Sequence, residues 1–142
     1  MTDSTIPPRG EMLAAISRGL VRLHRQYYGK GPTKAKTYAV NDTVICMLRG
    51  GFTAAEQTLI RDGKSDDVEY IRRSFQKTMK MQFINVVEEA TARHVIAYMS
   101  QVHADPDMAV ELFVLEAAEP QLIGEHEEDV VEEEPDRSVT SA

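Results

Sequence analysis

The sequence predicts an α+β fold in the order α-ββ-α-α-ββ, with a four-stranded antiparallel sheet built from two hairpins and helices packed on one face. Two pairs of β-rich segments are each separated by a few turn-forming residues, which is the pattern of a hairpin. Two other segments place apolar residues at steps of three and four, which is the period of a helix, and a third begins with the spacing of a capping box. The length of 142 residues suits one domain of this kind.

The first predicted helix covers residues 11–28. Its apolar side consists of Leu13, Ile16, Leu20, Leu23 and Tyr27. Arg18, Arg22 and Arg25 fall on the opposite side. Gly29 is expected to end the helix, because glycine adopts the left-handed conformation of a helix terminus without steric cost.

The first hairpin is predicted from the β-branched and aromatic residues at 37–40 and 43–48. Asn41 and Asp42 lie between them, and both can occupy the positive-φ positions of a tight turn. The alternative is one long strand with a bulge.

Two helices are predicted next. Thr53 and Glu56 have the spacing of a capping box, so a short helix should begin there and end near residue 62. Ser65 is expected to cap a longer helix that runs to about residue 92. The apolar stripe of this helix is Val68, Ile71, Phe75, Met79, Phe83, Val86 and Ala90. Arg72 is expected off the stripe or at its margin.

The second hairpin is predicted from residues 94–102 and 108–115, joined by the turn at 103–107. In the last strand Met108, Val110, Leu112 and Val114 alternate with Ala109, Glu111, Phe113 and Leu115. One side of this strand is therefore apolar and the other is mixed. The second face and the exposed sheet edges predict pairing with another copy, as a homodimer.

Charge is segregated along the chain. The formal net charge is −7, but nine acidic residues against Arg137 alone give residues 117–142 a charge of −8, which leaves +1 for residues 1–116. We expect a flexible leader at residues 1–10, a folded domain at 11–116 and a disordered acidic tail at 117–142. The tail could fold back over the basic first helix and compete with anionic partners.

Composition also bears on location. No apolar run approaches the roughly 18 residues needed to cross a bilayer, and the first residues lack the layout of a signal peptide. The single cysteine, Cys46, cannot form an internal disulfide. The sequence therefore predicts a cytoplasmic protein without a transmembrane segment.

The strongest candidate for a binding site is the segment 27–36, where glycines expose backbone amides among three lysines and a threonine. Phosphate or carboxylate would suit it, although it lacks the strand-to-helix context of a phosphate-binding loop and could be an ordinary turn with solvated lysines. The three arginines of the first helix extend its positive charge. The anion- or partner-binding candidates are Arg18, Arg22, Arg25, Lys30, Thr33, Lys34 and Lys36. The acidic total and the absence of tryptophan argue against nucleic acid.

No arrangement of residues indicates catalysis or a cofactor. The residues considered are His24, His94, His103, Cys46, Asp105 and Asp107. Cys46 lies in an apolar strand, which favours a buried structural thiol. His103, Asp105 and Asp107 are close enough in sequence to hold a metal, but three ligands in a turn more often cap the turn. We expect no enzyme activity, no metal and no cofactor.

Several of these motifs resemble the MpsC-like family of small bacterial proteins. The resemblance rests on YYGKGPTKAKTY at 27–38, LRGGFT at 48–53 with Glu56, HADPD at 103–107 and VELFVL at 110–115, and it covers residues 11–116. It implies association with a sodium-translocating system that generates membrane potential. For a chain without a membrane span, this means an accessory or regulatory role beside a membrane transporter subunit, at the inner membrane surface. The alternative is a sensor of a small phosphate- or carboxylate-bearing molecule.

Overall fold

The computed structural model describes residues 9–117, so the predicted leader and acidic tail lie almost entirely outside the described residues. The elements are α1 (Arg9–Tyr28), β1 (Lys34–Val40), β2 (Thr43–Arg49), α2 (Ala54–Arg61), α3 (Ser65–Thr91), β3 (Val95–His103) and β4 (Met108–Leu115). The predicted α+β class and element order are confirmed. α1 begins two residues earlier than expected, and β1 begins three residues earlier, so Lys34 and Lys36 belong to a strand and not to a loop.

The sheet is antiparallel throughout, with the strand order β1-β2-β4-β3. The first hairpin is confirmed, because β1 pairs with β2 up to Val40 opposite Thr43, and the alternative of one long strand is wrong. Asn41 has a φ of 53°, whereas Asp42, expected to share the left-handed conformation, does not adopt it. β1 and β3 are the two edges of the sheet.

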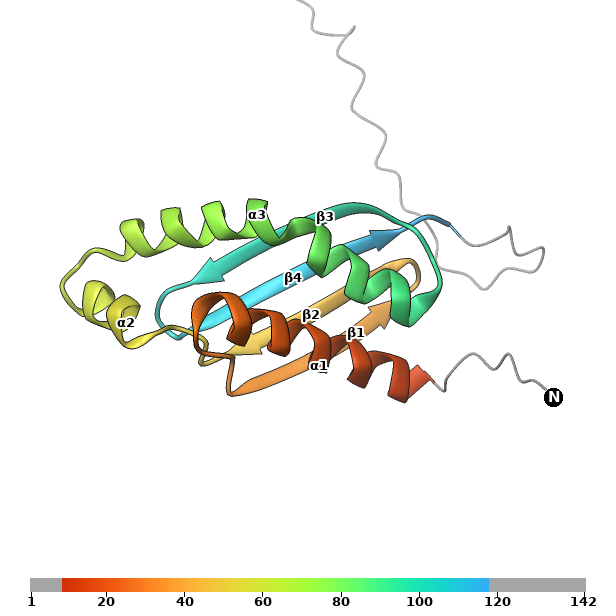
Figure 1. Ribbon diagram of the computed structural model, residues 1–142, viewed down its shortest axis with the longest axis horizontal. Helices are drawn as coiled ribbons and strands as arrows, with labels where there is room; N and C mark the ends of the chain where they lie inside the picture. The colour runs from red at the N-terminus through yellow and green to blue at the C-terminus, as the bar shows by residue number, and fades with distance from the viewer. Residues whose placement is uncertain (1–8, 118–142) are drawn as a thin grey trace, which may run out of the picture.

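The molecule has two layers, with α1 and α3 side by side on one face of the sheet (Figure 1). α1 packs over β1 and α3 packs over β3. α2 packs against α3 at one end of the molecule, as Figure 1 shows. No described helix covers the other face of the sheet, which we call the open face.

The core lies between the helices and the sheet. Its buried apolar residues include Ile16, Leu20, Val44, Cys46, Leu48, Met79, Phe83, Val87 and Phe113. In β4 the mixed side faces the helices, so Glu111 is buried beside Phe113 and Leu115. The uniformly apolar side of β4 lies on the open face. Polarity alone would favour burial of the apolar side and exposure of the mixed side. The mixed side can be buried because the Glu111 carboxylate has hydrogen-bond partners there, which are described below.

The capping box at the start of α2 is confirmed. The Thr53 amide donates to Glu56 Oε1 at 2.9 Å, and the Glu56 amide donates to Thr53 Oγ1 at 3.2 Å. The expected cap at Ser65 is wrong, because Lys64 is the N-cap of α3 and Ser65 is its first residue. The connection between α2 and α3 is short. The Lys64 amide donates to Leu59 O at the end of α2, and Lys64 is the one residue between the left-handed Gly63 and the start of α3.

The predicted apolar stripe of α3 is correct at Val68, Met79 and Phe83, which are buried. Two positions differ from the prediction. Ile71, expected in the stripe, is exposed, and Arg72, expected off the stripe or at its margin, is buried with 4% exposure. The start of α3 packs against α2 as well as against the sheet, because Val68 lies in one buried cluster with Val102 of β3 and with Leu59 and Ile60 of α2. Arg72 is buried there by its ion pair with Glu56 of α2.

Candidate functional site

The three arginines of α1 lie on one exposed side of the helix, as the sequence predicts. Their spacing of four and three residues places them along one line. None of the three guanidinium groups forms an ion pair with another residue in the range 9–117. Arg18, Arg22 and Arg25 are therefore free to meet an anionic partner.

The loop after α1 turns at Gly29, which has a φ of 81°. It packs against the end of the helix, since a Cβ at Gly31 would lie 3.4 Å from Arg25 Cβ. The amide and the hydroxyl of Thr33 both donate to Arg49 O, at 2.8 Å and 3.2 Å. The loop is thus fixed to the end of β2, and the Thr33 hydroxyl proton is already in use.

Lys34 and Lys36 alternate along β1 with Ala35 and Thr37. Thr37 faces α1, where its Oγ1 lies 2.7 Å from Ser17 Oγ. The two lysines therefore lie on the open face, on the opposite side of β1 from Thr37. The sequence predicted one continuous basic surface, and the structure divides it between the two sides of an edge strand.

Two shallow hollows connect these sides around β1. The first is lined by Arg18 and Lys36 together with small residues of α1 and β1. The second lies on the open face and is lined by Thr33, Lys34, Lys36 and Arg49, with Tyr38 and Met47. We call the cations Arg18, Lys34, Lys36 and Arg49 the basic edge. Arg49 was missed from the sequence, because its place beside Lys34 follows only from the register of β1 and β2.

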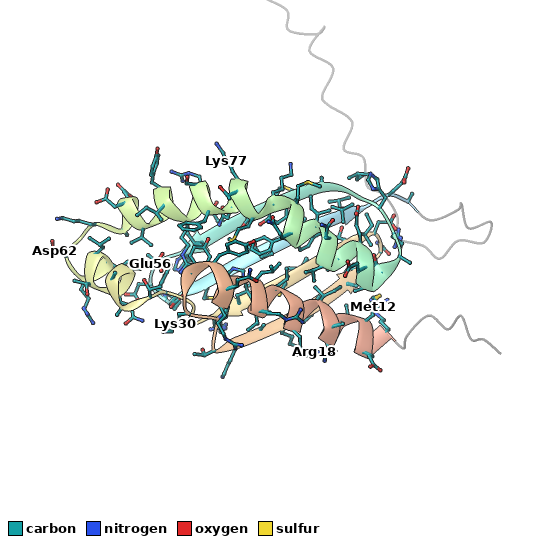
Figure 2. The ribbon with its side chains drawn as sticks, in the orientation of Figure 1. Met12, Arg18, Lys30, Glu56, Asp62 and Lys77 are labelled. Atoms are coloured by element: carbon teal, nitrogen blue, oxygen red, sulfur yellow. The ribbon has the colours of Figure 1, made fainter. Side chains whose placement is uncertain are left out.

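The basic edge is electrostatically one-sided. Neither hollow is lined by an aspartate or glutamate. Figure 2 shows Arg18 and Lys30 on the α1 side of the molecule, away from Lys77 on α3. β1 is also an edge strand, with one side of its backbone unpaired by a neighbouring strand. This combination suits an acidic segment of another protein, held by charge at either side of the strand.

A second polar group centres on Arg72 of α3. Its Nε and Nη2 donate to the two carboxylate oxygens of Glu56, at 2.6 Å and 2.5 Å, and Nη2 also donates to Gly51 O at 3.0 Å. The guanidinium lies 3.7 Å from the ring centroid of Tyr28. Burial alone would raise the pKa of Glu56, but hydrogen bonds from Arg72 and Thr53 lower it below its usual value. This group is a structural junction whose donors are used within the chain.

Asp107 completes the same end of the molecule. Its carboxylate accepts from the amides of Gly51 at 3.3 Å and Phe52 at 3.0 Å. His103 Nδ1 lies 2.9 Å from Pro106 O. The turn residues considered as metal ligands thus serve the loop after β2 and the turn itself, and residues 9–117 contain no cluster of three ligands placed to hold a metal.

Glu111 is the most deeply buried carboxylate described. Tyr98 donates to its Oε2 at 2.9 Å, and Ser100 Oγ donates to both carboxylate oxygens. Burial raises the pKa of Glu111 to about 7, although these hydrogen bonds and the charge of Arg72 oppose the shift. A neighbouring cavity of about 20 Å³ is lined by His24, Tyr28, Arg72 and Glu111 among others. That is room for about one water molecule, so the cavity is too small for a metabolite.

The remaining candidates for chemistry have structural surroundings. His24 is buried, with Nδ1 2.8 Å from Leu20 O and its ring stacked on Phe83 at 5.2 Å, and burial lowers its pKa. Burial raises the pKa of the Cys46 thiol to about 11, which disfavours a thiolate. His94 is exposed and lies 3.0 Å from a carboxylate oxygen of Glu88. No two of these residues are placed as a nucleophile and its base.

Comparison with known proteins identifies a family and a distant relative. Residues 8–117 match the family described as "Na+-translocating membrane potential-generating system (MpsC)". The uncharacterized protein YrhF of Bacillus subtilis (strain 168) is 24% identical over 97 residues, which cover 67% of this chain and 80% of YrhF. No solved structure matches significantly. Within residues 9–117, no helix is both long and apolar enough to cross a membrane.

Proposed function

Because the chain belongs to the MpsC family, we propose that it is a non-enzymatic accessory or regulatory protein of a membrane ion-translocating system. It acts by protein–protein contact in the cytoplasm, at the inner membrane surface, where it binds a transporter subunit. The family description supplies the membrane system, and the regulatory role is our inference.

The observation that carries this proposal is the positive charge around β1. Arg18, Arg22 and Arg25 are exposed along α1. Lys36 shares one hollow with Arg18 and another with Lys34 and Arg49 of the open face. A cluster of cations without acidic neighbours attracts an anionic surface and speeds its association. The buried polar groups at Arg72 and Glu111, in contrast, have their partners inside the chain.

The proposal is tested by affinity capture of the tagged full chain from gently solubilised cells, with mass spectrometry of the bound proteins. The test variant carries Arg18→Glu, Arg22→Glu and Arg25→Glu. The matched control carries Arg73→Glu, Lys77→Glu and Lys80→Glu, which reverse three exposed basic residues of α3. We expect a membrane transporter subunit to be captured by the wild type and by the control but lost from the α1 variant. Equal capture by both variants would refute the assigned surface.

The hollow on the open face favours a second candidate, a sensor of a small phosphate- or carboxylate-bearing molecule. Lys34, Lys36 and Arg49 line it together, whereas Lys30 does not. A ligand that binds only the folded state raises the melting temperature. Thermal-shift measurements with inorganic phosphate, nucleotides and dicarboxylates should therefore show stabilisation that Arg49→Ala removes. Absence of any shift over millimolar ligand would exclude this candidate.

A further inference from the structure

The open face of the sheet is a second surface, distinct from the helical side. Every other residue of each strand faces it, as the alternation of burial and the strand register show. These residues are Lys34, Lys36, Tyr38 and Val40 in β1, Thr43, Ile45, Met47 and Arg49 in β2, Met108, Val110, Leu112 and Val114 in β4, and Ala97, Met99, Gln101 and His103 in β3. Ten of these sixteen are apolar.

The apolar residues form one continuous area. One register row runs across all four strands through Tyr38, Ile45, Leu112 and Met99. Tyr38 is 44% exposed and Met99 is 54% exposed, and both lie on edge strands. A contiguous apolar area on the surface of a soluble protein often marks a site that another molecule covers. No described segment of the chain covers it.

We propose that a second copy of this chain covers the open face, so that two sheets pack face to face as a β-sandwich. Sheets pack in this way at a separation of about 10 Å, with inward side chains interdigitated. A four-stranded sheet with about seven residues per strand has a planar footprint of roughly 440 Å². Side-chain relief adds to this area, but the contact stays smaller than the standard interface of about 800 Å² per partner, so we expect a weak dimer.

The distribution of charge supports a second copy as the occupant. The cations of the open face, Lys34, Lys36 and Arg49, gather at one corner of the sheet. In a two-fold dimer the symmetry axis can lie in the interface, parallel or perpendicular to the strands. The basic corner of one copy then packs on a different corner of the other copy, so like charges do not face each other. The centre, formed by β2 and β4, contributes Ile45, Met47, Val110 and Leu112 and no charge. An apolar centre with a polar rim is the usual anatomy of a homodimer.

This proposal is independent of the proposed function, because it concerns the centre of the open face and leaves the arginines of α1 exposed. The sequence predicted a homodimer from the second face of the last strand and from the sheet edges together, and this proposal assigns the contact to the open face alone. In a face-to-face dimer the backbone edges stay unpaired, and Lys34, Lys36 and Arg49 lie at one corner of the interface.

The test is the mass of the full chain in solution, measured by light scattering from about 1 µM to about 1 mM, the range of weak to moderate affinities. We expect dimers of the wild type. Ile45→Glu and Leu112→Glu should give folded monomers, because each places two charges inside the interface. Met81→Glu is the matched control, since Met81 is an apolar residue of α3 that is 61% exposed on the other layer. It should remain dimeric.

Each other outcome overturns the proposal. A wild type that is monomeric at every concentration refutes the proposal. The measurement is then repeated in about 1 M salt, where the Debye length falls to about 3 Å. Dimers that form only under this condition would indicate that the acidic residues 117–142 cover the face instead. A dimer that survives both face variants uses the sheet edges. If the glutamate variants fail to fold by circular dichroism, Ile45→Thr and Leu112→Thr replace them. An unchanged dissociation constant in those threonine variants would contradict the proposal, which expects at least a tenfold rise.

Discussion

Arg72 of α3 and Glu56 of α2 form a buried bidentate ion pair, with N–O distances of 2.6 Å and 2.5 Å. The same glutamate closes the capping box of α2, and the same arginine donates to Gly51 O and stacks on Tyr28. Two charged side chains thereby join α1, the loop after β2, α2 and α3. The pair lies at the end of the molecule where α2 is located (Figure 2).

Removal of the arginine should therefore destabilise the protein strongly. In Arg72→Ala the Glu56 carboxylate stays buried without its partner, and a loss of about 3–5 kcal/mol in the free energy of unfolding is expected. Urea denaturation measures this loss. Arg73→Ala, at the exposed neighbouring position, should change stability by less than about 0.5 kcal/mol. Similar losses in the two variants would contradict the role of the pair.

The buried Glu111 should make stability depend on pH. Its folded pKa of about 7 lies above the usual 4.5, so the native state keeps a proton in this window that the unfolded chain releases. Stability contributed by this group is complete below about pH 4.5 and falls as pH rises to about 7, by at most about 1.4 kcal/mol per unit. Glu111→Gln should remove that fall while it keeps hydrogen bonds to Tyr98 and Ser100.

The measurement is the difference between the unfolding free energies of wild type and Glu111→Gln at several pH values. Taking the difference cancels His24, whose lowered pKa gives a slope of the opposite sign in both proteins. Glu89→Gln, at an exposed position of α3, is the control and should leave the profile unchanged. A difference that does not vary between pH 4.5 and 7 would show that folding does not raise the pKa of Glu111.

Much of the fold follows from local pattern, because hairpins and caps depend on residues close in sequence. Thr53 and Glu56 are three residues apart, and the turn at Asn41 and Asp42 separates two β-rich runs. The candidate site was predicted less well. The exposure of the three arginines of α1 could be predicted from the helical period. The orientation of Lys36 could not, because the sequence placed the start of β1 after this residue.

Two further errors concern buried charges. Periodicity treats every charged residue as solvent-facing, so it placed Arg72 off the buried side of α3 and gave no sign that Glu111 belongs to the core. The partner of Arg72 is 16 residues away, and Tyr98 is 13 residues from Glu111. Such pairs are recognisable only when tertiary structure brings them together.

Gly19 of α1 packs closely against Val86 of α3. A Cβ at this position would lie 2.6 Å from Val86 Cγ1 of α3, which is closer than real Cβ contacts allow. Gly19→Ala should therefore destabilise by about 1–3 kcal/mol, despite the better helix propensity of alanine. Val86→Ala removes the clashing methyl groups, so the double variant should lose less than the two single losses combined. Strict additivity in thermal or urea unfolding would contradict this contact.

The two hollows around β1 share Lys36, and the first of them also contains Arg18. If one acidic segment of a partner lies along this edge, Lys36→Glu and Arg18→Glu should each weaken binding by up to about fivefold, the range of exposed ion pairs. The effect should appear mainly in the association rate and shrink as salt rises. Lys80→Glu, an exposed reversal on α3, controls for the change in net charge. Surface plasmon resonance on the captured transporter subunit measures these rates. A loss with Arg18→Glu alone would confine the partner to α1, because Lys36 is the residue that connects the helix to the open face.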